Sequence, residues 1–175
     1  MVPLTTTRLI LRPFSLEDAS NVFVYAQDPQ VCIYTSWEPH QSEADSLVYV
    51  EQSIREQAQH PLSVLAVTLK TQPETVIGAV GLRPDASNPY ALEFAYAIAR
   101  PYWGQGIVLE ACQVLLENAR SKQDLKRIWG SCIRENVASA KILQKLGLEY
   151  EGCLRAKSYC YGRFWDLEYY GLLLK

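Results

Sequence analysis

The chain has few histidines, no pair of closely spaced cysteines and no strong excess of either charge. Its five cysteines are an odd number, are widely spaced and include no Cys-x-x-Cys pair, and only two histidines accompany them. These absences argue against both a disulfide framework and a zinc site. The cysteines are Cys32, Cys112, Cys132, Cys153 and Cys160. We therefore expect reduced thiols and no bound metal.

The charge balance and the lack of long apolar runs exclude further classes. Lys and Arg total 17 against 19 Asp and Glu, for a net charge of −2, and no basic run is present that would neutralise a row of phosphates. No run of about 18 apolar residues occurs, and the first 20 residues carry four charges instead of an apolar signal. We expect no nucleic-acid or membrane binding and a cytoplasmic location. A cationic, amine-bearing partner is compatible with this balance.

What the chain does have is apolar content, 49% of its residues, which at 175 residues is enough for a sizeable core. No linker or repeat interrupts it, so residues 1–175 are predicted to form one domain. Periodicity predicts strands at 7–12, 63–69, 76–82, 91–98, 126–133, 149–155 and 164–174 and helices at 15–27, 41–59, 107–120 and 137–146. Residues 28–40 look irregular. The order predicts a mixed α/β domain with a sheet covered by helices.

The turn between the strand 91–98 and the helix 107–120 is a candidate phosphate site. Residues 100–111 read RPYWGQGIVLEA, with Gly104 and Gly106 just before the helix. The N-terminus of a helix offers unpaired N–H groups, and glycine lets a phosphate approach them closely. A tight turn that binds nothing also favours glycine, so both interpretations stay open.

Two common phosphate motifs are missing from this turn. A P-loop requires Lys and Ser or Thr after its last glycine, whereas Gly106 is followed by Ile107 and Val108. A dinucleotide fingerprint requires a third glycine at the position of Leu109. A phosphate ligand here is therefore expected to be a diphosphate held by backbone groups without a metal.

The turn resembles the phosphate motif of the GNAT superfamily of N-acetyltransferases, in its RimJ/RimL-type branch. That motif is Gln/Arg-x-x-Gly-x-Gly/Ala, and it aligns at Trp103, Gly106 and Val108, of which only Gly106 matches strictly. Three further segments resemble the same branch, so that the resemblance covers nearly the whole chain: TTTRLILRPFSLEDA, ENVASAKILQKLGLEYEGCLR and GRFWDLEYYGLLL. It implies a mostly antiparallel, twisted sheet of about seven strands, splayed between the fourth and fifth.

The resemblance implies an acetyl-CoA-dependent enzyme that transfers acetyl directly to a primary amine in a ternary complex. The amine would be a protein N-terminal α-amine or a small amine. The implied contacts to acetyl-CoA are Ile98, Ala99, Arg100, Gly104, Gln105, Gly106, Ile107, Val108 and Asn136. Arg100 has the alternative of a solvated surface charge, and Asn136 also suits a helix N-cap. A backbone N–H near Ile98 or Ala99, beside a bulge, is expected to bind the oxyanion.

Glu93 is the candidate general base. Because an α-amino group with a pKa near 8 is mostly protonated at neutral pH, the reaction needs a proton acceptor or a water relay. Glu93 shares a strand face with the small residues Ala91, Ala95 and Ala97, which leave room for a substrate. The alternative is a structural carboxylate paired with an arginine.

Ser139 is the candidate partner of the leaving thiolate. Many GNAT enzymes carry a tyrosine seven residues after the helix asparagine, but that position is Leu143 here, and Ser139 stands three residues after Asn136. A hydroxyl is a far weaker acid than a thiol of pKa about 8.5, so we expect Ser139 to hydrogen-bond the sulfur. It would otherwise be a small, packed helix residue.

The acceptor pocket is expected in the irregular segment 28–40, with Tyr34 and Trp37 as substrate contacts. His40 is expected at the surface.

The missing tyrosine keeps an alternative function open, a catalytically silent GNAT-fold module that binds CoA as a sensor or interaction partner. A homodimer through the C-terminal strands is compatible with the sequence.

Overall fold

The computed structural model describes residues 2–121 and 124–174. Its elements, in chain order, are β1 (Leu4–Thr5), β2 (Leu9–Arg12), the 3-10 helix η1 (Leu16–Asp18), α1 (Ala19–Ala26), α2 (Pro29–Cys32), α3 (Glu43–Gln59), β3 (Leu65–Leu69), β4 (Gln72–Asp85), β5 (Asn88–Ile98), the 3-10 helix η2 (Arg100–Tyr102), α4 (Ile107–Arg120), β6 (Arg127–Ile133), α5 (Val137–Lys145), β7 (Glu149–Cys160) and β8 (Arg163–Leu173). In the described part of the chain, no helix combines the length and apolarity needed to cross a bilayer.

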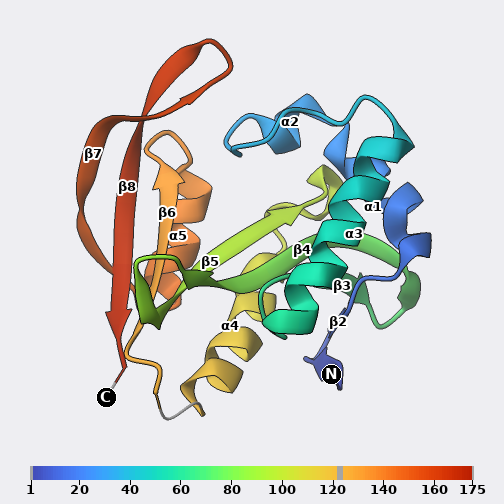
Figure 1. The fold of residues 1–175 in the computed structure, drawn as a ribbon, viewed down its shortest axis with the longest axis horizontal. Helices are drawn as coiled ribbons and strands as arrows, with labels where there is room; N and C mark the ends of the chain where they lie inside the picture. The colour runs from blue at the N-terminus through green and yellow to red at the C-terminus, as the bar shows by residue number, and fades with distance from the viewer. Residues whose placement is uncertain (1, 122–123, 175) are drawn as a thin grey trace.

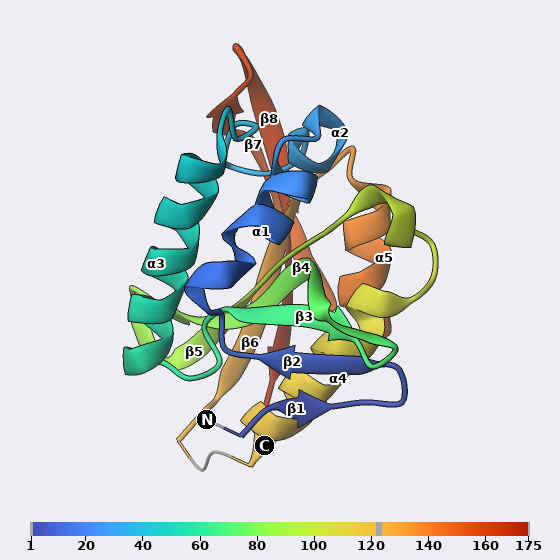
Figure 2. The same ribbon diagram turned by 90° about the vertical axis from the view of Figure 1, so that its right-hand side faces the viewer.

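The described strands form one open sheet in the order β1-β2-β3-β4-β5-β6-β8-β7, and among them only β5 and β6 pair in parallel. Helices α1 and α3 cover one face, while α4 and α5 cover the other (Figure 1, Figure 2). The predicted mixed α/β domain with a mostly antiparallel sheet is confirmed. The sheet has an eighth strand that was not predicted, because β1 has only two residues and is too short to show an alternating pattern.

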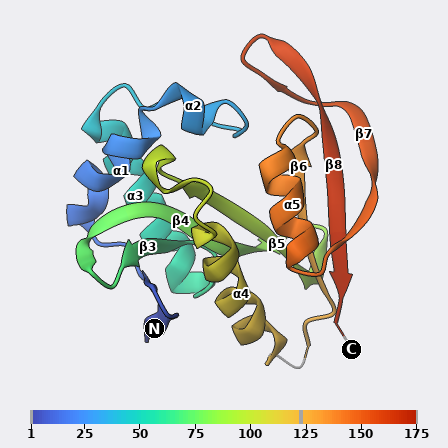
Figure 3. The ribbon, with the colours of Figure 1, turned by 180° about the vertical axis from the view of Figure 1, so that it is seen from behind.

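The predicted gap between two central strands is present between β5 and β6. These strands pair only from Ala91–Arg127 to Glu93–Trp129, although β5 continues to Ile98. Beyond this point they diverge, which is visible from behind (Figure 3). The physical reason is that β6 pairs along its whole length with β8, from Arg127 to Ile133, and therefore follows the β7–β8 ribbon.

The prediction of a bulge near Ile98 or Ala99 was wrong. The register of β4 against β5 is continuous from the Gly78–Ile98 pair to the Pro84–Leu92 pair, and it shifts only between Pro84 and Asp85. The gap therefore arises from the departure of β6 and not from a distortion at the end of β5.

Two apolar clusters hold the helices on the sheet. The one beneath α4 includes Leu115 and Ala119, which are fully buried, and Val22 and Val50 belong to the one beneath α1 and α3. Helix α4 buries the residues that the helical period selected. Full burial of a Leu or Val side chain contributes about 1.5–3 kcal/mol, so the two clusters hold the helices on either side of the gap.

Two local predictions failed. Residues 70–75 were predicted to lie between two strands. The β3–β4 turn is in fact confined to Lys70 and Thr71, because Gln72 already pairs with Leu69, and the rest of this stretch belongs to β4. The segment 28–40 contains the short helix α2, whose N-terminus is capped by the Asp28 side chain accepting from the Gln30 N–H.

Candidate active site

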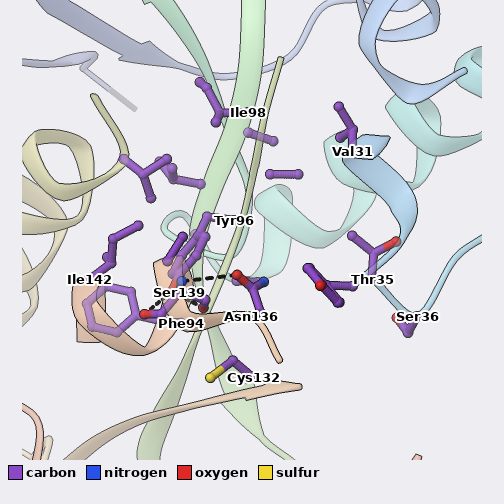
Figure 4. A pocket seen from close by; sticks show the side chains of 18 of the residues that line it. Val31, Thr35, Ser36, Phe94, Tyr96, Ile98, Cys132, Asn136, Ser139 and Ile142 are labelled. Atoms are coloured by element: carbon purple, nitrogen blue, oxygen red, sulfur yellow. Dashed lines mark hydrogen bonds between the residues drawn. The ribbon is translucent and has the colours of Figure 1, made fainter. Parts of the chain in front are cut away.

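A cleft of about 990 Å³ opens where β5 and β6 separate. Val31 and Thr35 line it from the α2 side, while Asn136 and Ser139 line it from α5, with Tyr96 of β5 between them (Figure 4). Because the strands are apart here, a ligand in the gap would contact residues from both faces of the sheet.

The glycine turn at the start of α4 presents its backbone to this cleft. Gly104 and Gly106 have φ of 72° and 75°, a left-handed conformation that favours glycine. A Cβ on Gly104 would meet nothing within 4 Å, and one on Gly106 would meet only Arg8 Nη2 at 3.8 Å. Gly106 is the N-cap of α4, and no side chain caps the helix. Open space beside uncapped N–H groups fits the predicted diphosphate.

Arg8, which the sequence analysis did not identify as a site residue, connects this turn to the sheet through hydrogen bonds. Its Nη2 donates to the Gln105 carbonyl at 3.0 Å and its Nε to Glu110 Oε2 at 2.7 Å, while Thr6 Oγ1 donates to Glu110 Oε1. Burial raises the pKa of Glu110, but these hydrogen bonds outweigh it and lower the pKa overall. A carboxylate in the first turn of α4 is thus balanced by a guanidinium. No sequence signal links residues so far apart.

The end of β5 turns backbone N–H groups toward the gap. Ala99 N–H donates to the Ile77 carbonyl at 2.8 Å. Because antiparallel pairs alternate, the N–H groups of Tyr96 and Ile98 point away from β4, toward the side that β6 has left. Trp103 Nε1 donates to the Ile98 carbonyl at 2.8 Å and fixes that peptide. Of the two expected oxyanion donors, the Ile98 N–H is therefore free to serve, whereas the Ala99 N–H is used within the sheet.

Glu93 lies in the cleft on the face covered by α1 and α3. It is half-buried and stands opposite Arg83 of β4 and Trp129 of β6. Burial raises the pKa of Glu93, and the positive charge of Arg83 opposes this shift. Arg83 forms its ion pair with Glu56, at 3.8 Å. Glu93 thus combines partial burial with a raised pKa, as candidate general bases commonly do.

Ser139 lies on the opposite side of the gap, hydrogen-bonded to Tyr96, which the sequence analysis did not identify as a site residue. Its Oγ is 2.7 Å from Tyr96 Oη, and its N–H donates to Asn136 Oδ1 at 3.1 Å, the N-cap of α5. Burial raises the pKa of Tyr96, so the phenol stays neutral. Leu143 is buried and would touch a Cβ on Gly130 at 2.7 Å. Position 143 of α5 is thus a packed leucine, while the phenol next to Ser139 comes from β5, a juxtaposition that only the fold creates.

Cys132 of β6 also lines the cleft (Figure 4). Burial raises its pKa to about 11, and the negative charge of Glu168 adds to the shift. Its thiol is therefore protonated at neutral pH.

The segment before α3 supplies the aromatic wall. Tyr34 packs edge-on against Trp165 with ring centroids 5.9 Å apart, and Trp37 packs against His40 at 5.6 Å. Tyr161, at the tip of the β7–β8 hairpin, donates to the Trp37 carbonyl at 2.9 Å and holds this segment in place. The hairpin and the segment therefore form one continuous rim of the cleft.

The expected surface position of His40 was wrong. His40 is half-buried and lines the cleft, and its Nδ1 lies 2.8 Å from Ser46 Oγ. Burial lowers its pKa, so the ring is neutral at pH 7. The prolines nearby suggested an exposed loop, but packing against Trp37 and Tyr49 covers the ring.

The structure gathers most of the predicted site residues in this cleft. Those that line it are Glu93, Ile98, Gly104, Gly106, Val108, Asn136, Ser139, Tyr34 and Trp37. The side chains of four others are engaged elsewhere. Arg100 pairs with Asp28 at 2.9 Å, Gln105 Nε2 donates to the Pro101 carbonyl, and Ala99 and Ile107 are buried in the two apolar clusters. Within residues 2–121 and 124–174, no group of three or more His, Cys, Asp and Glu is placed to hold a metal.

Comparisons with known proteins agree with this geometry. A family model described as the acetyltransferase (GNAT) domain matches residues 8–149. An uncharacterized N-acetyltransferase, p20 of Bacillus licheniformis, is 31% identical over 175 residues, covering 99% of this chain and 97% of its own length. A GNAT-family acetyltransferase structure from Bacillus anthracis superimposes with a TM-score of 0.86 at 22% identity, covering 98% of each chain. RimL, a ribosomal-protein α-N-acetyltransferase in complex with coenzyme A, gives 0.83 at 18% identity, covering 98% and 97%.

Proposed function

Because the chain belongs to the GNAT family and is an acetyl-CoA-dependent N-acetyltransferase, we propose that it acetylates a primary amine, a protein N-terminal α-amine or a small amine, bound on the Glu93 side of the cleft. The observation that carries this proposal is the gap between β5 and β6. It joins the glycine turn and Ser139 on one side to the Glu93 carboxylate on the other.

The residues on the α4 and α5 side fit acetyl-CoA. When bound, acetyl-CoA supplies a thioester whose carbonyl carbon accepts the amine and whose sulfur departs as a thiolate. The N–H groups of residues 104 to 108 would hold its pyrophosphate, for which the uncapped start of α4 and the space at Gly104 leave room. RimL, which has the same fold, is known in complex with coenzyme A and supports this placement.

Four groups of the chain would act at the reacting atoms. The Ile98 N–H donates to the oxygen on which negative charge develops. Of the Tyr96 and Ser139 hydroxyls, which are 2.7 Å apart, one donates to the other, and the second donates to the sulfur. Full proton transfer to the sulfur is uphill, because a phenol of pKa about 10 is a weaker acid than a thiol of about 8.5. Glu93 takes the proton from the amine, directly or through one water.

The first test is turnover with defined amines. Purified protein is mixed with acetyl-CoA and a panel of primary amines and peptides, free thiol is measured, and the product is identified by mass spectrometry. We expect acetyl-CoA at 100 times its Kd to stabilise the fold by about 2.7 kcal/mol, a rise of about 5–11 °C in Tm. ATP should give no such rise. Stabilisation by acetyl-CoA without an acetylated product from any amine would contradict the proposal.

Arg8→Gln is expected to weaken acetyl-CoA binding. Without Arg8, the Gln105 carbonyl loses its donor and the Glu110 charge is left unbalanced beside the turn. Arg8 is substantially exposed, so we expect a modest loss, about tenfold in KM for acetyl-CoA with kcat nearly unchanged. Arg55→Gln, which removes an exposed arginine on α3 paired with Glu51, is the matched control. An unchanged KM would show that Arg8 does not position the turn.

A further inference from the structure

The residue at the tip of the β7–β8 hairpin adopts a backbone conformation that its side chain disfavours. Cys160 pairs with Arg163, so Tyr161 and Gly162 form a two-residue turn, and both have positive φ, 53° and 72°. Turns of this kind favour Asn-Gly, because asparagine and glycine enter the left-handed region far more readily than a bulky residue does. A tyrosine held there indicates a function that a better turn former could not perform.

The hydroxyl of Tyr161 reaches the segment between α2 and α3. Its Oη lies 3.0 Å from the Cys32 carbonyl oxygen and 2.9 Å from that of Trp37. The same two carbonyl oxygens lie 2.8 and 3.0 Å from Thr35 Oγ1. Because each hydroxyl has one hydrogen to donate, the two hydroxyls together can satisfy both carbonyls. The loop 32–37 is thus closed by one hydroxyl of its own and one from the hairpin.

This loop forms a wall of the cleft. Residues 33–37 line the cavity, and Thr35 and Ser36 are visible on the α2 side of it (Figure 4). The loop and the hairpin tip are more than 100 residues apart in the sequence, yet they meet at one end of the molecule (Figure 1, Figure 2). The hydroxyl of Tyr161 therefore helps to set the position of this wall relative to the rest of the site.

Other contacts hold the segment without the hydroxyl of Tyr161. At the start of α2, Arg100 Nε lies 2.9 Å from Asp28 Oδ2. Within the loop, the ring of Tyr34 packs edge-on against Trp165 of β8. Removing the Tyr161 hydroxyl leaves both contacts in place. The loop should then become more mobile while the domain stays folded.

We propose that Tyr161 is a positioning residue for the acetyl acceptor, because its hydroxyl fixes the loop 32–37 in the conformation that contacts the amine. This inference rests on the proposed amine acetylation and adds a residue that acts on the acceptor site from the hairpin. Tyr161 acts through the carbonyls of Cys32 and Trp37 and makes no use of the glycine turn at the start of α4. Its loss should therefore weaken binding of the amine and spare binding of acetyl-CoA.

The test compares Tyr161→Phe, which keeps the ring, with Tyr161→Asn, which favours the turn, since both remove the hydroxyl. Kinetics are measured with whichever of tyramine, spermidine and an alanine-initiated tetrapeptide the wild type turns over fastest. For the loss of one hydrogen bond, we expect both variants to raise KM for the amine about two- to tenfold and to leave KM for acetyl-CoA unchanged. Tyr161→Asn should have the higher Tm of the two. Tyr159→Phe, at a tyrosine of the same hairpin whose ring packs against Phe164, is the matched control.

Hydrogen exchange gives a second readout that requires no turnover. The amides of residues 33–37 should exchange faster in both Tyr161 variants than in the wild type and in Tyr159→Phe. A wild-type KM for the amine in Tyr161→Asn would show that Tyr161 serves only the turn and would overturn the proposal, as would unchanged exchange in both variants. Equal losses for both substrates together with a lowered Tm would assign a general structural role and overturn it too. No acetylated product from any amine refutes the proposed function itself, whatever the exchange result, which keeps the two failures apart.

Discussion

Gly106→Val is expected to reduce acetyl-CoA binding at least about 100-fold, equivalent to about 2.7 kcal/mol, as measured by calorimetric titration. Gly106 has φ of 75° and caps α4, and the only atom near a Cβ there is Arg8 Nη2. The valine side chain would fill the space through which a pyrophosphate reaches the helix N–H groups, and its branched Cβ would strain the left-handed backbone.

The effect of backbone strain in Gly106→Val must be separated from the loss of acetyl-CoA binding. A second glycine with a similar φ serves as the control. Gly162, in the β7–β8 turn, has φ of 72° and no atom within 4 Å of its Cβ position. Gly162→Val therefore carries the same conformational cost, about 1–3 kcal/mol, far from the turn. We expect it to lower Tm as much as Gly106→Val but to bind acetyl-CoA normally. Normal binding by Gly106→Val would place the phosphates elsewhere.

Glu93→Gln is expected to lower kcat about 100-fold at pH 7 while acetyl-CoA binding stays intact, because the general base is lost and the turn is untouched. The amide keeps the shape of the side chain, and Arg83 retains Glu56. Tm should therefore stay close to that of the wild type. The measurement is the pH dependence of kcat for both proteins with one amine.

The direction of the pH effect follows from the two ionisations. Burial raises the pKa of Glu93 above its ordinary 4.5, so the carboxylate is available as a base only above that raised value. An α-amine is mostly protonated below about pH 8, and there it requires the base. The ratio of wild-type to mutant rate should therefore be largest between these two pKa values. It should shrink above pH 8, where the amine loses its proton unaided, and below the Glu93 pKa, where both side chains are neutral. A ratio that does not change with pH would remove Glu93 from proton transfer.

The same buried carboxylate links stability to pH. Because its pKa is raised in the folded state, the unfolded chain loses the Glu93 proton first as the pH rises. The Glu93 contribution to stability is therefore full below the unfolded pKa and declines as the pH climbs through the folded one. Glu93→Gln should remove this part of the pH dependence of Tm.

The sequence determined the features that depend on neighbours along the chain. The helical period of α4 selected the residues that are buried, and the alternation along β5 placed Glu93 on one face and Tyr96 on the other. The glycines at 104 and 106 marked a turn whose left-handed backbone requires them. These are local properties, because residue type and spacing alone dictate conformation and face.

The tertiary structure decided what depends on residues far apart in the chain. It set the Tyr96 hydroxyl against that of Ser139 and the Arg8 guanidinium against the glycine turn. It also engaged the Ala99 N–H with the Ile77 carbonyl and turned the Ile98 N–H away from β4, because strand register decides which backbone groups the sheet uses. The physical reason is that β6 follows β8 away from β5, and the gap this leaves brings the chemistry of both faces into one cleft.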